Sequence, residues 1–325
     1  MERSKIRFLV RIATPVLLLV VVFRWVDWDR FFSVLAQADY ALMGVGFALY
    51  LGAVFLQGWR WHILLSADGI GKPFLLFQTV NYAANFFDLF TPGKLGSDVY
   101  RVVCFRTEVR VHDMISALCT LRLQGLLFNL ALVAITAVYY FRWIGIALLA
   151  LVLIGVSLLI VPVGLLRRVS DGLRVRWRGK SKGGFMADQV CDHLAALLNA
   201  FQVLQRNRTT MVSTTVLAGV ATLLSILIYM VIGQAFHMKL EFTGYLLVVP
   251  LLTVASVLPV TIHGRGVTEA LALFFWLGPD ASVEQILLTC LAVYVVVLGH
   301  GLLGGLVWIG VHPYIAEFSV ARKSN

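Results

Sequence analysis

The sequence predicts an all-α protein that crosses a membrane several times, and three observations support this fold class. Hydrophobic residues make up 60% of the 325 residues, and charged residues make up only 14%. Apolar runs of about twenty residues, the length that a helix needs to cross a bilayer, recur along the chain. A soluble domain needs far more polar surface than this. We therefore expect residues 1–325 to form a single membrane domain.

Six segments are long and apolar enough to be full membrane spans. They lie at about 8–26, 40–58, 114–140, 144–166, 210–236 and 285–311. The first follows a basic start but has no cleavage site of small residues, so we interpret it as an uncleaved span. Two further apolar regions, 73–105 and 243–278, are interrupted by Thr91-Pro92-Gly93 and by Pro259 through Gly266. Each of these is two spans, one kinked span or a re-entrant hairpin.

The basic residues favour re-entrant hairpins. If both interrupted regions enter and leave on the same face, 21 Lys and Arg lie on the cytoplasmic side and 5 on the outer side, as expected for a cytoplasmic (inner) membrane. Both termini are then cytoplasmic. Residues 1–141 and 143–311 have the same order of elements in opposite orientation, which is an inverted repeat. An odd number of crossings in each half also inverts the second half without any shared ancestry.

Residues 167–208, between the two halves, are predicted to be a basic cytoplasmic loop. Arg167–Gly184 holds seven basic residues and one acidic residue, so the alternative function of this segment is to bind anionic lipid headgroups. An amphipathic helix follows, with apolar residues at helical spacing. These are Val190, Leu194, Leu197, Phe201 and Leu204. The positive charge is explained by loop placement, and we expect no nucleic-acid binding.

The first interruption is followed by charged residues, in the stretch NFFDLFTPGKLGSDVYRVVCFR from Asn85 to Arg106. Backbone that leaves helical geometry at membrane depth needs partners in protein or water, which predicts a polar cavity. Thr91 suits a helix N-cap and Pro92 the first helical position, so a half-helix is expected to direct its amides into this cavity. Such a helix start favours an anion such as phosphate.

Charged and polar side chains near this break are the candidate binding residues. Lys94 and Arg101 are seven residues apart and share a helical face, and Asp98 lies between them, where it can neutralise both. Asn85 and Asp88 line the preceding half-helix. The alternative is that the two cations only mark the cytoplasmic boundary.

The second interruption carries SVLPVTIHGRGVTEALALFF, from Ser256 to Phe275. Gly264 and Gly266 permit unusual backbone conformations, and a helix is expected to start near Thr268. Arg265 and Glu269 form either an ion pair or a site whose carboxylate faces the cavity, where it carries a proton or binds a headgroup amine.

Polar residues within the spans need partners of their own. Arg122 lies inside an apolar span, so it needs Asp88, Asp98 or a ligand phosphate. Gln124, Asn129 and His300 are expected to form hydrogen bonds between helices. The four cysteines are scattered and predict neither a disulfide framework nor a metal site.

The two interrupted segments together resemble motifs of the lysylphosphatidylglycerol synthase transmembrane-region family of flippase-like membrane proteins. The first motif matches at Pro92, Gly93, Gly96, Asp98 and Arg101, and the second at Pro259, Gly264, Gly266 and Glu269. GWRWHILL and Arg122 match weaker family features. The chain departs from the family pattern at Ser97, Leu121, His263 and Arg265.

The resemblance implies a lipid transporter, because the best-known members move aminoacylated phosphatidylglycerol between leaflets and others are linked to glycolipid pathways. Bifunctional members add a soluble aminoacyl-transfer domain. This chain ends fourteen residues beyond its last predicted span, so we expect it not to synthesise such lipids by itself.

We therefore predict a flippase-like transporter of a phosphate-bearing phospholipid or glycolipid, without a cofactor or metal. Its partners are a membrane lipid with an anionic headgroup and lipid-biosynthetic enzymes. The alternatives are a membrane-embedded glycosyltransferase or other lipid-modifying enzyme with Asp98 or Glu269 as base, and a non-catalytic scaffold. The sequence has no HExxH pattern of a zinc-dependent enzyme. The predicted substrate-binding residues are Asn85, Asp88, Lys94, Asp98, Arg101, Arg122, Arg265 and Glu269. The predicted backbone breaks are Pro92, Gly93, Gly96, Pro259, Gly264 and Gly266.

Overall fold

A computed structural model describes residues 26–67, 69–91, 95–106, 109–141, 146, 208–257 and 265–321. All regular secondary structure in these ranges is helical, which confirms the predicted fold class. The helices are α2 (Trp28–Ala36), α3 (Tyr40–Ala67), α4 (Phe74–Asp88), α5 (Leu95–Phe105), α6 (Val111–Phe141), α10 (Arg208–Ala235), α11 (Phe242–Val257), α12 (Val267–Trp276) and α13 (Val283–Ala321).

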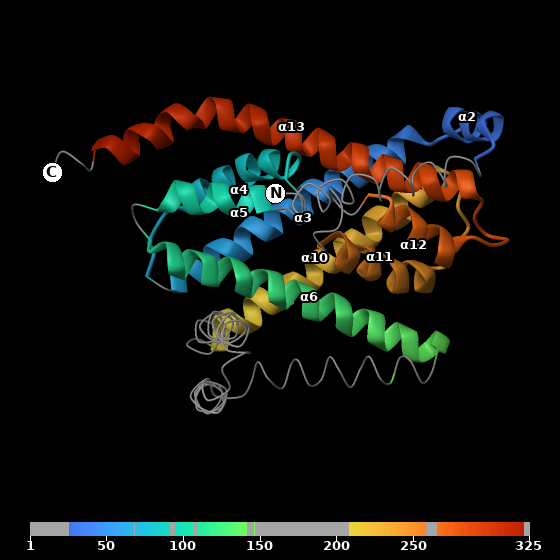
Figure 1. Cartoon of the computed structure of the whole chain (residues 1–325), viewed down its shortest axis with the longest axis horizontal. Coiled ribbons are helices and arrows are strands. Elements are labelled where there is room, and N and C mark those ends of the chain that lie inside the picture. Colours follow the sequence, from blue (N-terminus) through green and yellow to red (C-terminus); the bar gives the residue numbers. More distant parts are fainter. Residues whose placement is uncertain are drawn as a thin grey trace, which may run out of the picture.

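In the part of the chain that the structure describes, four helices are long and apolar enough to cross a membrane, and they correspond to four of the six predicted spans. Their apolar segments are Tyr40–Ala67, Asp113–Tyr139, Arg208–Ala235 and Val283–Gly310. At about 1.5 Å per residue, each exceeds the hydrocarbon core of about 30 Å. The other two predicted spans, 8–26 and 144–166, lie almost entirely outside the described residues. The long helices run along the length of the molecule (Figure 1).

The faces of α10 show how the sequence adapts a helix to lipid. One face is exposed and apolar, with Val212, Val216, Val220, Leu223 and Leu227. The opposite face is buried and contains the small or polar residues Thr210, Thr214, Ala218 and Thr222, followed by the apolar Ile226. Small and polar residues at helix contacts are typical of membrane bundles. Consistent with this, α10 packs closely along α3.

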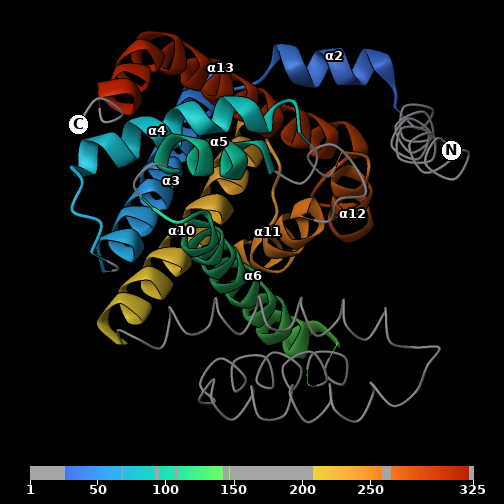
Figure 2. The same ribbon diagram turned by 60° about the vertical axis from the view of Figure 1, so that its left-hand side comes forward.

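Each interrupted region forms a pair of short helices instead of one long span. The first pair is α4 with α5, and the second is α11 with α12. Figure 1 shows the two pairs in opposite halves of the molecule, and Figure 2 shows the same grouping from another direction. Short connections join α4 and α5 to α3 and α6, and join α11 and α12 to α10 and α13. The two hairpins therefore open toward opposite ends of the bundle.

The packing of the two halves follows one pattern. α4 lies against α13 in the other half, and α11 lies correspondingly against α6. Likewise, α3 packs against α4 and α10 packs against α11. On this correspondence we propose that residues 1–141 and 143–311 form an inverted repeat. The basic loop predicted at 167–208, apart from Arg208 at the start of α10, lies outside the described residues.

Glycines in α13 hold α4 in place. A Cβ atom at Gly304 would overlap the carbonyl oxygen of Tyr82, and one at Gly305 would lie 2.8 Å from the ring of Phe86. Only glycine permits this approach of the two backbones. Because α4 carries Asn85 and Asp88, the close contact also positions part of the candidate site.

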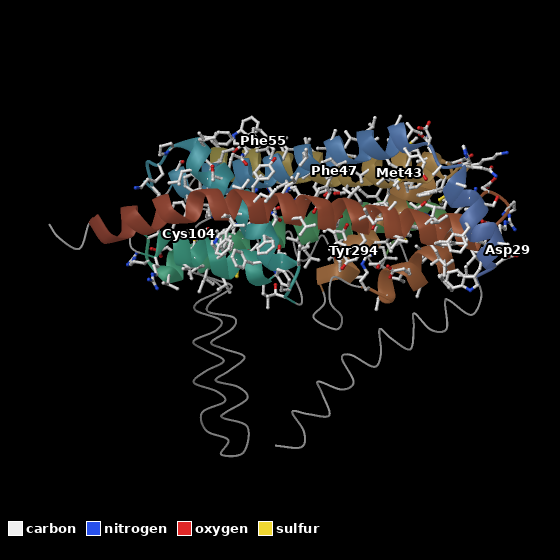
Figure 3. The ribbon with its side chains drawn as sticks, turned by 90° about the horizontal axis from the view of Figure 1, so that it is seen from above. Asp29, Met43, Phe47, Phe55, Cys104 and Tyr294 are labelled. Atoms are coloured by element: carbon white, nitrogen blue, oxygen red, sulfur yellow. The ribbon has the colours of Figure 1, made fainter. Side chains whose placement is uncertain are left out.

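The short helix α2 was not predicted. Asp27 caps it by accepting hydrogen bonds from the amides of Asp29 and Arg30 at 3.1 and 3.2 Å. Phe31 is buried, whereas Trp28 and Phe32 are exposed. Figure 3 shows α2 crossing the end of the bundle at a steep angle to α13. The helix has nine residues, which is too short for a sequence pattern typical of a span.

Candidate functional site

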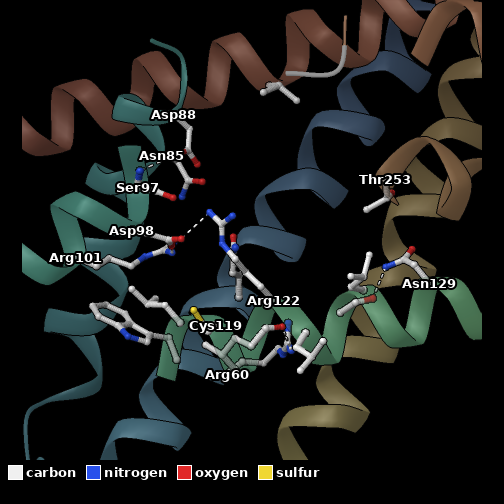
Figure 4. A pocket seen from close by; sticks show the side chains of 18 of the residues that line it. Arg60, Asn85, Asp88, Ser97, Asp98, Arg101, Cys119, Arg122, Asn129 and Thr253 are labelled. Carbon is white, nitrogen blue, oxygen red and sulfur yellow. Dashed lines mark hydrogen bonds and ion pairs between the residues drawn. The ribbon is translucent and has the colours of Figure 1, made fainter. Parts of the chain in front are cut away.

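A cavity of about 430 Å³ lies between α3, α4, α5, α6, α11 and α13. Five charged residues line it, from four of these helices. They are Arg60, Asp88, Asp98, Arg101 and Arg122. The uncharged polar residues of the lining include Tyr50, Gln57, Asn85, Ser97, Asn129, Thr253 and His300. Figure 4 shows most of these side chains directed toward a common space.

Asp98 joins two arginines in this cavity. Its Oδ1 accepts a hydrogen bond from Arg101 Nη1 at 3.1 Å, and its Oδ2 lies 2.6 Å from Arg122 Nη2. The Arg101 side chain is 5% exposed, that of Asp98 19% and that of Arg122 35%. Arg122 is therefore the arginine of this cluster that a guest reaches first. Of the three partners considered for Arg122, the structure selects Asp98 (Figure 4).

Arg101 is fixed by contacts with the two neighbouring helices α4 and α3, in addition to Asp98 of its own helix. It donates from Nη2 to Asn81 Oδ1 at 2.6 Å, and its guanidinium carbon lies 5.6 Å from the centre of the Trp61 ring. Trp61 packs edge-on against Phe77 and Phe105. Nevertheless, Arg101 Nε and Trp61 Nε1 are buried donors without a partner among the described residues.

The start of α5 is capped by the protein itself. The amide of Ser97 donates to Asp88 Oδ1 at 2.8 Å, and the amide of Gly96 donates to Thr91 Oγ1 at 2.8 Å. A Cβ atom at Gly96 would overlap the carbonyl of Phe87, which explains the glycine. These two amides are therefore occupied by Thr91 and Asp88, while Gly93 and Lys94 lie outside the described residues, so the binding of a phosphate by the helix start stays a prediction.

The structure describes part of the first predicted break and the residues around it. Pro92, Gly93 and Lys94 lie outside the described residues, so the expected pairing of Lys94 with Asp98 stays a prediction. Asn85 does line the cavity, and its amide nitrogen donates to the carbonyl of Asn81 at 2.6 Å. Asn85, Asp88, Asp98, Arg101 and Arg122 are thus brought together as predicted candidates.

Arg60 is a cavity residue that the sequence analysis did not select. It is 8% exposed and donates to the carbonyls of Thr214 and Leu121 and to Gln124 Oε1, at 3.0, 3.2 and 3.3 Å. These bonds tie α3 to α10 and α6. The predicted span ended at residue 58, which placed Arg60 in a loop, whereas α3 continues to Ala67. The match of GWRWHILL to a family feature was the available signal.

Arg265 and Glu269 form a separate ion pair. Arg265 Nη1 lies 2.7 Å from Glu269 Oε1, while Oε2 accepts from the Gly266 amide at 2.6 Å and from the Thr268 hydroxyl at 2.9 Å. Of the two alternatives, the structure forms the ion pair. Gly266 has a φ of 83°, which favours glycine.

The second pair does not belong to the cavity of the first. Neither Arg265 nor Glu269 is among the described residues that line it. Arg265 instead stacks 3.7 Å from the ring centre of Tyr294 on α13. The second interrupted segment therefore reaches this cavity through Thr253 and Val254 of α11, and its charged pair lies outside the lining that the structure describes. Pro259 and Gly264 lie outside them.

The polar residues predicted to connect helices behave differently from one another. Gln124 donates to Thr214 and Thr215 at 3.0 and 3.1 Å, and Asn129 donates to Thr222 at 3.4 Å, as expected. His300 packs against the rings of Tyr50 and Tyr82, with both centroid distances at 5.3 Å. Within the described residues, no three His, Cys, Asp or Glu side chains come together as a metal site requires.

The family model described as "Lysylphosphatidylglycerol synthase TM region" matches residues 8–306, which include both hairpins and every described cavity residue. No curated protein matches the chain.

Proposed function

Because the chain belongs to the lysylphosphatidylglycerol synthase TM region family, we propose that it moves a phosphate-bearing lipid between the two leaflets of a membrane. The family and the apolar helices make it a membrane protein whose function concerns membrane lipids. We propose three further points: the protein moves the lipid, the lipid carries a phosphate, and both termini lie on the cytoplasmic side of an inner membrane.

The charge of the cavity is the observation that supports it best. Among the described residues of its lining, Arg60, Arg101 and Arg122 face Asp88 and Asp98, which leaves one positive charge in excess. Buried positive charge is costly at membrane depth unless an anion or water compensates it. The unpartnered donors Arg101 Nε and Trp61 Nε1 lie in the same lining. A phosphodiester supplies one negative charge and several acceptor oxygens.

Asp98 is suited to act as an exchangeable partner for the two arginines. Without a guest it neutralises Arg101 and Arg122, and a phosphate that enters competes with it for Arg122. The carboxylate restores the resting pair when the phosphate leaves. Transport also requires that the inward-facing and outward-facing states bind the lipid differently.

The contact between α5 and α6 provides a place for the acyl chains. Three apolar side chains here are about half exposed or more: Val99 (62%) and Val103 (50%) of α5 and Ile115 (49%) of α6. Cys119, one turn beyond Ile115, is exposed and lines the cavity. A headgroup can therefore occupy the cavity while its acyl chains lie against apolar side chains.

The proposal is tested with purified protein in vesicles that contain labelled phosphatidylglycerol. Wild type is expected to accelerate exchange between leaflets without any co-substrate. Arg122→Gln should slow the exchange about tenfold, the value of one charge-assisted hydrogen bond. Arg110→Gln is the matched control, because Arg110 forms an exposed pair with Asp113 at 2.8 Å. An Arg122→Gln protein that exchanges lipid at the wild-type rate would overturn the phosphate site.

The same vesicles separate the other functions. Consumption of an activated sugar in place of leaflet exchange would identify a lipid-modifying enzyme. Inactivity in both assays would favour a scaffold that recruits lipid-biosynthetic enzymes.

A further inference from the structure

Buried polar atoms without partners concentrate at the cavity. In the described part of the chain, seven buried side-chain nitrogen or oxygen atoms make no hydrogen bond. Four of them belong to residues that line this one cavity, namely Trp61, Arg101, Asn129 and His300. Because an unsatisfied buried polar atom destabilises a fold, such a concentration indicates a polar guest. The first two are donors that suit phosphate, whereas the last two require another explanation.

Asn129 presents an acceptor. Its Nδ2 donates to the carbonyl of Gly125 at 2.8 Å and to Thr222 at 3.4 Å, which fixes the orientation of the amide. The residue is 6% exposed, and its Oδ1 has no partner among the described residues. Figure 4 shows Asn129 near Thr253 of α11 and away from the pair of Asp98 with Arg122. A guest that satisfies Oδ1 must donate a hydrogen bond.

His300 presents a second group from another helix. It lies on α13, is 1% exposed, and its Nε2 has no partner among the described residues. The imidazole also contacts the rings of Tyr50 and Tyr82, each with a centroid distance of 5.3 Å. A neutral imidazole nitrogen either donates or accepts a hydrogen bond, so it pairs with a hydroxyl in either tautomer.

We infer that Asn129 and His300 bind hydroxyl groups of the lipid headgroup, so that the cavity selects a phosphodiester that carries a polyol. The inference rests on the proposed function, since it concerns the same cavity. An ammonium group is a poorer fit because both carboxylates have other partners. Asp98 pairs with two arginines, and Asp88 caps α5. Neutral acceptors such as Asn129 Oδ1 suit hydroxyl donors.

Two lipids of equal charge test this selection. Phosphatidylglycerol and phosphatidylpropanol are both phosphodiesters with one negative charge, but only the first has headgroup hydroxyls. Each displaces a fluorescent phosphatidylglycerol from purified protein in detergent. We expect wild type to prefer phosphatidylglycerol about tenfold, the effect of one or two hydrogen bonds. Equal displacement by both lipids would overturn the inference.

Variants assign the preference to the two residues. Asn129→Leu and His300→Phe should each reduce it to about threefold or less, mainly by weakening the binding of phosphatidylglycerol. Tyr245→Phe is the matched control, because it removes a buried hydroxyl that also lacks a partner but lies outside the cavity lining. If Asn129→Leu does not fold, His300→Phe decides alone. An unchanged preference in the variants that fold would overturn the assignment.

Binding and transport fail separately in this design. A wild-type protein that selects phosphatidylglycerol but does not exchange it between leaflets would overturn the proposed transport and support the polyol site. A protein that exchanges both lipids equally well and binds them equally well would support the proposed transport and overturn the polyol site.

Discussion

The two helical hairpins contain the same kinds of group and use them differently. In the first, capping and ion pairing are done by two different carboxylates: Asp88 caps the start of α5, and Asp98 pairs with Arg101 and Arg122. In the second, Glu269 alone caps α12 and pairs with Arg265. Each hairpin also places an arginine near an aromatic ring, Trp61 in one case and Tyr294 in the other.

This difference separates a binding arrangement from a structural one. In the first hairpin Asp88 caps α5, so Asp98 is not needed as a cap and pairs only with arginines. Arg101 and Arg122 can therefore exchange Asp98 for a guest in the cavity. Glu269 is 6% exposed, and its two oxygens accept three hydrogen bonds. The sequence analysis considered it as a proton carrier. In the structure both of its carboxylate oxygens are engaged in a local ion pair and cap.

Replacement of Glu269 should have the largest effect on stability. Glu269→Gln leaves Arg265 largely buried without its counter-charge, and we expect a loss of about 3 kcal/mol in the free energy of unfolding. A fluorescence-detected thermal unfolding curve in detergent measures this as a lower apparent Tm.

A double variant sharpens the interpretation. Arg265→Met combined with Glu269→Gln removes both charges and should recover a large part of the loss, because the unpaired charge causes most of it. If Glu269→Gln instead retains its stability and stops lipid exchange, the second hairpin takes part in transport. The distinction between a binding hairpin and a structural one would then be wrong.

Replacement of Asp98 should change binding more than stability. Asp98→Asn removes the group that competes with phosphate for Arg122, so we expect phosphatidylglycerol to bind about tenfold more tightly. The lipid should also leave more slowly, which lowers the exchange rate. Displacement of fluorescent lipid and leaflet exchange measure the two effects. Weaker binding in this variant would show that Asp98 supports the guest instead of replacing it.

Much of the fold was predictable because lipid imposes strong constraints on sequence. Long apolar runs identified four spans that the structure describes, and Thr91-Pro92-Gly93 and the Gly-rich break marked both hairpins. The charges near the first break were also identified, since Asp98, Arg101 and Arg122 are costly at membrane depth. Five predicted candidates therefore line one cavity.

The remaining features depend on contacts between distant parts of the chain. Arg60 lies at the end of an apolar run, where an arginine in a loop is expected. Its hydrogen-bond partners are 61 and 154 residues away in the sequence, so only the folded structure shows that it is buried. The choice of Asp98 as the partner of Arg122 depends on how α5 packs beside α6. Similarly, only the structure reveals that Asp88 accepts a hydrogen bond from the Ser97 amide at the start of α5.

The aromatic partner of Arg265 provides the smallest predicted effect and the most specific test of the second hairpin. Tyr294→Leu should lower the free energy of unfolding by about 1 kcal/mol, because the guanidinium carbon lies 3.7 Å from the ring centre. Tyr294→Phe keeps the ring and should match wild type in apparent Tm. Neither variant should alter lipid exchange, since Tyr294 is not among the described residues that line the cavity. If leucine and phenylalanine have equal effects, the ring does not stabilise Arg265, and the hairpins differ in more than their carboxylates.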